Sequence, residues 1–330
     1  MNNKLSICVP TYNRAAYLPI ALDSILDQIS DRVEIAICDN GSIDETPSVI
    51  ASYVRKYPWI KHYRFEKNVG PDRCFLKSVE IAGGEYCWFL GDDDAIDKGS
   101  IHEVLQSLDQ NRELSGISIN RKIFDATLKN EQKYEPIYPG LLSSRHYRDS
   151  HQCIKELFTY FGYMSGQIFR RSLWMQAIRQ TPNVERYFNA YSILFLVVKS
   201  ILIDPNWLYL HTAYVQYRSG NDSFEKELGI YKRFLLDAIG YESLARGLFR
   251  RWDPLYRQCL DQVCSQHLQA RIVYMKRSGV VPFFPMKALA VLLPRYWMLT
   301  SFWKKNLPIL LIPNFIRPSL RFLYRLVRPR

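Results

Sequence analysis

The stretch that decides the fold reads GGEYCWFLGDDD and occupies residues 83–94. Its middle, Tyr86–Leu90, is a short aromatic and aliphatic run bounded by glycines, which is typical of a strand buried on both faces of a parallel sheet. Asp92, Asp93 and Asp94 follow at the carboxyl end of that strand, the edge where open α/β sheets bind ligands. A hard divalent cation and the phosphates of a ligand would relieve the repulsion among three carboxylates. The alternative is a solvated acidic turn that caps a helix starting near Lys98.

Strand and helix patterns alternate before this stretch. Strands are predicted at Leu5–Pro10, Val33–Cys38 and Trp59–Phe65, and helices at Leu18–Ile29 and Pro71–Ala82. Strands separated by helices indicate a parallel, doubly wound sheet. Polar clusters follow the first two strands, at the edge where such a sheet builds its site.

Size and cysteine content favour a folded protein of the cytoplasm. The chain has 330 residues, of which 48% are hydrophobic, enough for a large core. Its seven cysteines are odd in number, contain no CxxC pair and lie mostly in apolar runs. This pattern favours reduced, buried thiols over a disulfide framework or a zinc site. Residues 1–4 lead straight into a strand pattern, so no signal peptide is expected.

The net charge of +12 belongs to the C-terminal segment. From Arg271 to Arg330 there are twelve Lys and Arg and no Asp or Glu, whereas 32 basic and 32 acidic residues precede Arg271. Apolar and aromatic residues interleave with these charges, which favours an anionic membrane surface over nucleic acid. Gly279–Trp303 is interrupted by charges and prolines, so we expect it to lie on the membrane or dip into it.

A helix beginning at Asn314 would separate charge from apolar surface. Its arginines at positions 317, 321, 325 and 328 would form one stripe, and its apolar residues would face elsewhere. That is the geometry of an interfacial helix against anionic lipid. The alternative is a helix packed on the rest of the protein with solvated arginines.

Four segments in order carry a resemblance to a known family. They read SICVPTYNR at residues 6–14, CDNGSIDET at 38–46, NVGPDR at 68–73 and FLGDDD at 89–94. Together they closely resemble the motifs of family 2 glycosyltransferases, which have the nucleotide-diphospho-sugar-binding fold called GT-A. The resemblance is best across residues 4–105. NVGPDR, YCW at 86–88 and RSGNDSFEK at 218–226 also resemble abequosyltransferases of O-antigen synthesis, which implies a deoxy- or dideoxyhexose donor.

The resemblance implies an α/β architecture with a Rossmann-like, mostly parallel sheet and flanking helices. Residues 1–225 would form the GT-A catalytic domain, with a nucleotide-sugar half at about 1–105 and an acceptor half at about 106–225. Residues 226–330 would form a helical, basic, membrane-associating region. In the acceptor half, Arg121–Tyr138 is polar and predicts a loop over the site, Tyr187–Leu202 a helix and Trp207–Tyr217 a strand. Gly229–Arg250 predicts a helix that packs on the catalytic core.

The resemblance also implies site residues. Those that would bind the nucleotide-sugar are Pro10, Thr11, Tyr12, Arg14, Asp39, Asn68, Arg73, Asp92, Asp93 and Arg218. Asp94 would be the metal ligand, with Asp93 nearby for ribose or metal, and the ion would be Mg²⁺ or Mn²⁺. Family members often show D-x-D-D here, but Gly91 stands where the first acid would be, so Asp92 has either a site role or that of a solvated turn.

For several of the other predicted site residues, a purely structural role is the alternative. Asp39 would accept a hydrogen bond from the base, or serve plain turn chemistry. Asn68 and Arg73 would contact the nucleotide or its diphosphate, or cap the helix that follows Pro71. The guanidinium of Arg218 can pair bidentately with phosphate.

An inverting transfer needs a base that takes the proton of the acceptor hydroxyl. Many family members carry a Glu-Asp pair where this chain has residues 184–191, and that pair is absent here. Glu185 is the nearest acid. Asp222 is a second candidate, which would alternatively help to bind diphosphate or metal. A solvent-exposed turn is the structural alternative for both.

The reaction implied is inverting, metal-dependent transfer of a sugar to a hydroxyl of a polyprenyl-diphosphate-linked glycan, in surface polysaccharide synthesis. The enzyme would be peripheral on the inner face of the cell membrane, with no nucleic acid partner. One alternative is a sugar nucleotidyltransferase, but residues 10–14 are not the glycine-rich loop expected of that class. Another is a non-catalytic protein that binds an anionic surface or nucleic acid, which predicts salt-sensitive binding.

Overall fold

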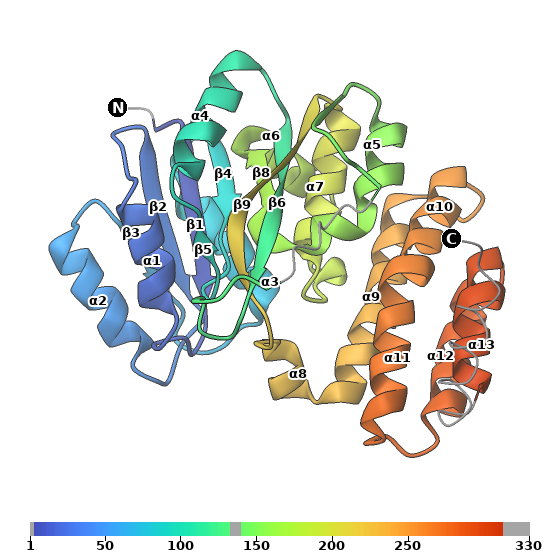
Figure 1. The fold of residues 1–330 in the computed structure, drawn as a ribbon. Helices are drawn as coiled ribbons and strands as arrows, with labels where there is room; N and C mark the ends of the chain where they lie inside the picture. The colour runs from blue at the N-terminus through green and yellow to red at the C-terminus, as the bar shows by residue number, and fades with distance from the viewer. Residues whose placement is uncertain (1–2, 133–139, 313–330) are drawn as a thin grey trace. The chain divides into compact units, whose positions relative to one another are not determined.

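The computed structural model describes residues 3–132 and 140–312 of the chain. The chain divides into two units, Met1–Asn221 and Asp222–Arg330. The first unit holds a mixed sheet flanked by helices, and the described part of the second is helical (Figure 1). The predicted α/β fold with a helical C-terminal region is therefore confirmed, whereas the functional boundary at residue 225 stays a prediction.

The sheet is built outward from β1 (Leu5–Thr11), in which every residue is buried. β1 pairs in parallel with β2 (Val33–Asp39) on one side and with β4 (Tyr86–Phe89) on the other. β3 (Lys61–Arg64) pairs in parallel with β2. The carboxyl ends of these strands therefore meet at one edge, and the polar clusters singled out in the sequence follow three of them.

The acceptor half extends this sheet with antiparallel pairings. β8 (Gln167–Arg170) lies antiparallel between β4 and β6 (Gly116–Phe124), and β6 pairs in parallel with β9 (Trp207–Arg218). β5 (Ala95–Ile96) and β7 (Arg145–Tyr147) pair antiparallel with β9. Since two antiparallel pairings separate β4 from β6, β6 and β9 run in the same direction as β4. Their carboxyl ends thus reach the edge that carries the three aspartates.

The predicted loop at residues 121–138 is wrong in its first part. β6 continues through Phe124, because its pairing with β9 persists past register shifts on both sides of Asn120. Propensity alone does not reveal this strand, since its partner lies far away in the sequence. Residues 133–139 of the predicted loop lie outside the described residues.

Helices cover both faces of the sheet. Those of the first unit are α1 (Leu18–Leu26), α2 (Thr46–Lys56), α3 (Pro71–Ile81), α4 (Ser100–Gln110), α5 (Ser150–Leu157), α6 (Arg171–Arg179) and α7 (Ser192–Ile203). Because successive side chains of a strand point to opposite faces, Ile7 packs into the cluster that contains the apolar residues of α1 and α4. Cys8 points the other way and donates to the Ser78 carbonyl on α3 over 3.6 Å. All seven cysteines are buried free thiols.

Helix α7 begins later than the apolar pattern predicts. The carboxylate of Asp72 on α3 accepts hydrogen bonds from the main-chain nitrogens of Ala190 and Ser192, at 2.9 and 3.1 Å. Ala190 has a positive φ of 68°, which no helix interior accommodates. The predicted helical start at residue 187 is therefore corrected to Ser192.

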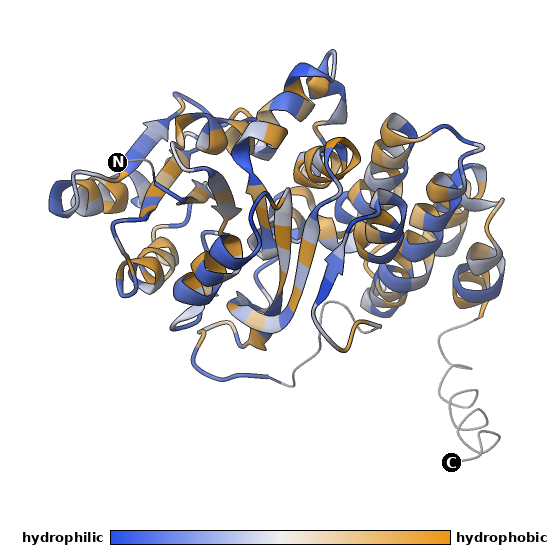
Figure 2. Cartoon of the chain, turned by 90° about the horizontal axis from the view of Figure 1, so that it is seen from above, coloured by the Kyte–Doolittle hydropathy of each residue, from blue (hydrophilic) through white to orange (hydrophobic). Residues whose placement is uncertain are grey.

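The described elements of the second unit are helical. They are α8 (Ser223–Leu228), α9 (Ile230–Leu248), α10 (Pro254–Gln262), α11 (Gln269–Ser278), α12 (Phe284–Tyr296) and α13 (Leu307–Leu311), with π-helical turns at Val263–Leu268 and Phe302–Asn306. α9 lies within the helix predicted at residues 229–250. Most helices of the chain carry both hydrophilic and hydrophobic residues (Figure 2).

Helix α12 divides its apolar residues between two faces. Phe284, Ala288, Leu292 and Tyr296 are buried, and the ring of Phe284 contacts that of Phe234 on α9 at a centroid distance of 5.2 Å. Phe283, Met286 and Trp297 are exposed. Among the helices of residues 3–132 and 140–312, none has the length and apolar character that a bilayer crossing requires. The arginine-striped helix predicted from residue 314 lies outside the described residues.

Candidate functional site

The acidic run, Asp92–Asp94, follows β4 and forms a turn in which the Asp94 main-chain nitrogen donates to the Gly91 carbonyl over 3.1 Å. Asp94 is buried, and both of its carboxylate oxygens accept hydrogen bonds. Oδ2 accepts from the hydroxyls of Ser165 and Tyr163 at 2.6 and 3.1 Å, and Oδ1 accepts from the Arg218 main-chain nitrogen at 3.1 Å. Burial, together with the charge of Asp93, raises the pKa of Asp94 to about 7. Asp94 thus joins the ends of β4 and β9.

Asp92 faces the loop after β1. Its Oδ2 accepts a hydrogen bond from the Tyr12 main-chain nitrogen at 3.3 Å, and its Oδ1 lies 3.4 Å from Nε of Arg14. Burial and the charge of Asp93 raise the pKa of Asp92 to about 7, although Arg14 opposes the shift. The solvated-turn interpretation is therefore not supported, since this carboxylate connects β4 to the loop after β1.

Asp93 lies between these two carboxylates and is half-buried. Its Oδ2 accepts a hydrogen bond from Asn221 at 2.6 Å, and its main-chain oxygen accepts one from Nε of Arg218 at 2.8 Å. Burial raises the pKa of Asp93. Arg218 is itself buried, and its Nη2 has no hydrogen-bond partner among the described residues. That nitrogen remains able to donate to a bound anion.

The alternative of an acidic helix cap is not supported. α4 begins at Ser100, its N-cap is Gly99, and no side chain caps it. The acidic run is instead engaged with β1 and β9.

The turn after β2 places Asp39 at the same edge. Asp39 is buried, its Oδ1 accepts from the Ser42 main-chain nitrogen at 2.9 Å, and its Oδ2 lies 3.1 Å from Nε of Arg64. Gly41 has a φ of 73°, and a Cβ there would lie 2.5 Å from the main-chain carbon of Lys67. Pro10 and Thr11 are buried at the end of the neighbouring β1.

Asn68 and Arg73 take part in local contacts. Asn68 Oδ1 accepts hydrogen bonds from Asn40 and from the Gly70 main-chain nitrogen, at 3.0 and 2.9 Å. These bonds hold the segment before α3 against the turn after β2. Nη2 of Arg73 donates to Oε2 of Glu185 over 2.7 Å, so the structure pairs a predicted diphosphate contact with a candidate base.

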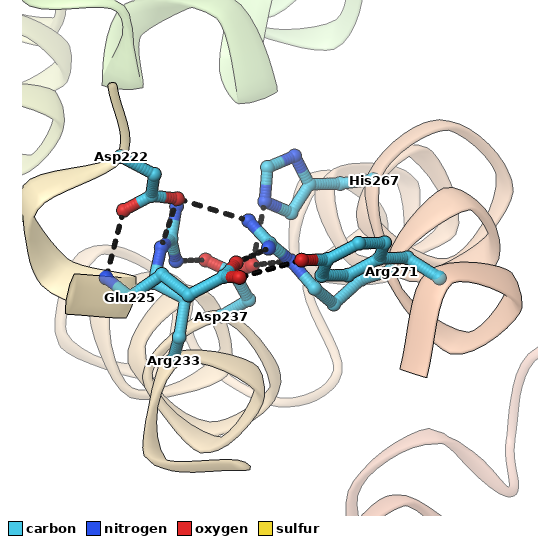
Figure 3. Close-up of polar contacts among 7 residues, drawn as sticks. Asp222, Glu225, Arg233, Asp237, His267 and Arg271 are labelled. Atoms are coloured by element: carbon cyan, nitrogen blue, oxygen red, sulfur yellow. Dashed lines mark hydrogen bonds and ion pairs between the residues drawn. The ribbon is translucent and has the colours of Figure 1, made fainter. Parts of the chain in front are cut away.

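Asp222, the other candidate base, belongs to a charge cluster in the second unit (Figure 3). It caps α8 by accepting from the Glu225 main-chain nitrogen at 3.0 Å. Arg233 and Arg271 lie 2.9 and 3.5 Å from its Oδ2. Its contacts are structural, and its role as a base or a diphosphate contact stays a prediction.

The donor set of the acidic run fits a magnesium or manganese ion. Such ions prefer oxygen ligands, and Mg²⁺ bound with a nucleotide takes one or two carboxylates plus phosphate oxygens and water. Asp92 and Asp93 are half-buried, adjacent carboxylates, whereas the oxygens of Asp94 already face three protein donors. Among the described residues, no three His, Cys, Asp or Glu side chains gather as metal ligands. Asp93 therefore fits a metal ion better than Asp94.

Sequence reasoning missed four residues around Asp94. Ser165 and Tyr163 donate to it, while Arg121 on β6 and Tyr217 on β9 contact the Tyr163 ring. Tyr163 and Ser165 lie just before β8, and their sequence gives no sign of a partner for Asp94. Only the pairing of β8 with β4 and β6 reveals that partner.

Comparison with known proteins identifies the family. The model of glycosyl transferase family 2 matches residues 6–175. The chain is 31% identical to abequosyltransferase RfbV of Salmonella typhimurium, over 75% of this chain and 76% of that protein. The match favours the predicted transferase over a nucleotidyltransferase or a non-catalytic binding protein.

Solved structures agree in fold. The crystal structure of Staphylococcus aureus TarS 1-349 in complex with UDP superimposes with a TM-score of 0.60 at 18% identity, covering 97% of this chain and 86% of that one. The mannosyltransferase PcManGT of Pyrobaculum calidifontis, in complex with GDP-Man and Mn²⁺, gives 0.56 at 13% identity, covering 98% and 88%. With its acidic run at the sheet edge and a family match over residues 6–175, the chain belongs to glycosyl transferase family 2.

Proposed function

We propose that this glycosyltransferase transfers a deoxy- or dideoxyhexose from a nucleotide-diphospho-sugar to a hydroxyl of a lipid-linked glycan, with inversion and with the help of Mg²⁺ or Mn²⁺. The observation that supports this donor site most directly is that the acidic run contacts both Arg14 and Arg218 at one edge of the sheet. Similarity to an abequosyltransferase supports the sugar class. Structures of the same fold with UDP, or with GDP-Man and Mn²⁺, support the nucleotide and the ion.

The leaving nucleoside diphosphate must be stabilised as its negative charge develops. Arg218 supplies the unpartnered Nη2, and Arg14 supplies a guanidinium beside Asp92. We assign Asp93, with Asp92 beside it, to the metal ion; Asp94 as a direct ligand stays a prediction. When bound, the ion would act as a Lewis acid on the diphosphate.

The nucleotide would lie over the ends of β1 and β2. Asp39 and Thr11 end these neighbouring strands, and Tyr12 follows β1. A buried carboxylate can accept hydrogen bonds from a base or a ribose. Asn68 and Arg73 would bound this part of the site from the segment that begins α3.

Glu185 is the better candidate for the base. Its side chain is 62% exposed, it lies in the unit that carries the acidic run, and its partner Arg73 is also exposed. An exposed ion pair exchanges partners at little cost, so an incoming acceptor can displace it. Asp222 faces two arginines and caps a helix, so its carboxylate is already engaged by several partners in the second unit.

The second unit would hold the enzyme at the inner face of the membrane. Phe283, Met286 and Trp297 are exposed along α12, and Lys and Arg are the only charged residues from Arg271 onward. Exposed apolar and aromatic groups with basic neighbours suit a bilayer interface that contains anionic lipid. This location is where a polyprenyl-diphosphate-linked acceptor would be presented.

Calorimetric titration with UDP, CDP, GDP and dTDP, with and without Mn²⁺, tests the donor site. We expect one nucleotide to bind in preference to the others and to bind more tightly with Mn²⁺. The corresponding sugar nucleotide, incubated with membranes that contain acceptor, should then release that nucleoside diphosphate. Binding of none of the four would contradict the proposed function.

A further inference from the structure

Arg121 on β6 lies in a corner formed by two tyrosine rings. Its guanidinium carbon is 4.4 Å from the centroid of the Tyr163 ring and 4.0 Å from that of Tyr217. The two rings are 5.8 Å apart and meet at 84°. The guanidinium therefore contacts both rings at once, and its orientation is set by two faces that are nearly perpendicular.

The charge of Arg121 acts on the buried carboxylate of Asp94, where it opposes the rise in the pKa, but no direct ion pair joins the two side chains. Its Nε is buried and makes no hydrogen bond, and its guanidinium forms no ion pair within residues 3–132 and 140–312. Contact with aromatic faces offsets only part of the hydration that a half-buried guanidinium loses. By contrast, the next residue, Lys122, pairs with Asp97 at 2.5 Å. Arg121 is thus oriented and charged, and among the described residues no anion contacts its guanidinium directly.

The corner lies beside the acidic run. Tyr163 donates its hydroxyl to Asp94, and Tyr217 precedes Arg218, whose main-chain nitrogen donates to the same carboxylate. Arg121 is near the carboxyl end of β6, which reaches the same sheet edge as β4. A guanidinium oriented in advance by its neighbours is suited to bidentate recognition of phosphate.

We propose that Arg121 binds a diphosphate group in the transferase site, and that Tyr163 and Tyr217 hold its guanidinium in place for that contact. The inference rests on the proposed function. The diphosphate belongs either to the nucleotide-sugar donor or to the polyprenyl carrier of the acceptor, since both present the same chemistry.

Calorimetry on the full chain with Arg121→Met tests this inference. One arm uses the nucleoside diphosphate that the wild type binds, with Mn²⁺, and the other uses farnesyl diphosphate as a lipid diphosphate probe. We expect at least tenfold weaker binding in one arm. If Arg121→Met binds the nucleoside diphosphate more weakly, Arg121 contacts the diphosphate of the donor. If it binds farnesyl diphosphate more weakly, Arg121 contacts the diphosphate of the carrier. Arg121→Lys, which keeps the charge but loses the planar fork, should bind with intermediate affinity.

Lys122→Met is the matched control, because it removes a charge from the adjacent residue of the same strand. It should bind both probes like the wild type. Thermal unfolding separates binding from packing: because Arg121→Met removes two cation–π contacts as well as the charge, its loss of binding is compared at a temperature where the variant is fully folded. Wild-type affinity of Arg121→Met in both arms, or equal losses in both variants, would overturn the inference and leave the proposed function standing. A wild-type protein that binds neither probe would overturn both.

Discussion

At the residue scale, Asp94 and Asp93 are adjacent carboxylates with different surroundings. Asp94 is buried with three donors on its two oxygens, whereas Asp93 is half-buried and accepts one side-chain hydrogen bond, from Asn221. A buried acceptor that holds several donors contributes to stability, and a more accessible carboxylate is available to a ligand. The two residues should therefore respond differently to the same substitution.

We predict that Asp94→Asn lowers the free energy of unfolding by about 1–3 kcal/mol, the usual cost of leaving a buried donor without its acceptor. The new amide cannot accept from Ser165 on the side where it carries its nitrogen. Urea unfolding followed by circular dichroism measures the change. An unchanged unfolding midpoint would contradict the role of Asp94 in joining β4 to β9.

Asp93→Asn is the matched substitution. It should leave the unfolding midpoint near the wild-type value and weaken the Mn²⁺-dependent part of nucleoside diphosphate binding at least tenfold, because one anionic oxygen ligand is lost. Calorimetric titration with and without Mn²⁺ measures this difference. If Asp93→Asn keeps the full metal effect and Asp94→Asn loses it, the original assignment of the metal to Asp94 is correct.

At the element scale, the turn after β2 depends on Gly41. Its φ of 73° disfavours any side chain, and the main chain of Lys67 fills the space where a Cβ would lie. Gly99, with a φ of 82°, has the same backbone restriction but open space around it. Comparing the same substitution at the two glycines therefore separates the cost of backbone strain from the cost of steric overlap.

We predict that Gly41→Ala costs clearly more stability than Gly99→Ala. The left-handed conformation costs a side chain about 1–2 kcal/mol, which both variants lose. Gly41→Ala must in addition move the Lys67 main chain and with it the Asn40–Asn68 contact. Urea unfolding of both variants measures the difference. Equal losses of unfolding free energy would contradict the prediction, because they would show that the Lys67 main chain moves aside at no cost.

The helices of the second unit are tied by the charge cluster of Figure 3. Asp237 on α9 is fully buried, and it pairs with Arg233 one turn earlier, with Arg271 on α11 and with His267. Burial alone would raise the pKa of Asp237, but its contacts with His267 and with the two arginines hold it below its usual value. The cluster thus stabilises the ionised carboxylate.

Acid should therefore destabilise this unit. Because the pKa of Asp237 is lower in the folded than in the unfolded chain, its contribution is complete above the ordinary carboxyl pKa of about 4 and is lost as the pH falls below it. Urea unfolding between about pH 5 and pH 2 should show this loss. Asp237→Asn should remove this part of the pH dependence and cost about 3–5 kcal/mol at pH 7, as expected when a buried ion pair loses one partner. The same acid dependence in the variant would contradict the assignment to Asp237.

At the scale of the whole molecule, charge and apolar exposure are unevenly distributed along the chain. The excess of positive charge begins at Arg271, and exposed apolar residues recur from Val280 to Leu311. In the first unit, basic residues such as Arg14 and Arg218 lie beside carboxylates. The proposed membrane binding should therefore depend on the second unit.

We predict that Phe283→Ser with Trp297→Ser weakens binding to phosphatidylglycerol-containing vesicles by about tenfold or more, because each change removes a large apolar side chain from the interface. Vesicle sedimentation at low and high salt measures the effect. Trp252→Ser is the control, since Trp252 is equally exposed but lies outside the basic segment. An equal loss in the control, or strong binding to purely zwitterionic vesicles, would contradict the proposed surface.

Local pattern explains which parts of the molecule were predicted correctly. β1, β2 and β4 are short apolar runs followed by polar clusters, and the parallel arrangement of such strands brings Thr11, Asp39 and the acidic run to one edge. The predictions for residues 121–124 and for the start of α7 were wrong, because pairing with β9 and main-chain hydrogen bonds to the Asp72 carboxylate decide them. These partners lie far away in the sequence.

The sequence by itself determined the strand and helix order of the nucleotide half, the position of the acidic run and the glycosyltransferase family, because each depends on residues close together in the chain. Only the tertiary structure decided how the three aspartates differ and that Arg121 meets two tyrosines. Those properties depend on β8 entering between β4 and β6, and on the burial and hydrogen bonds that follow from it. Burial and hydrogen bonding control the energy of a charge, and neither exists before distant segments pack together.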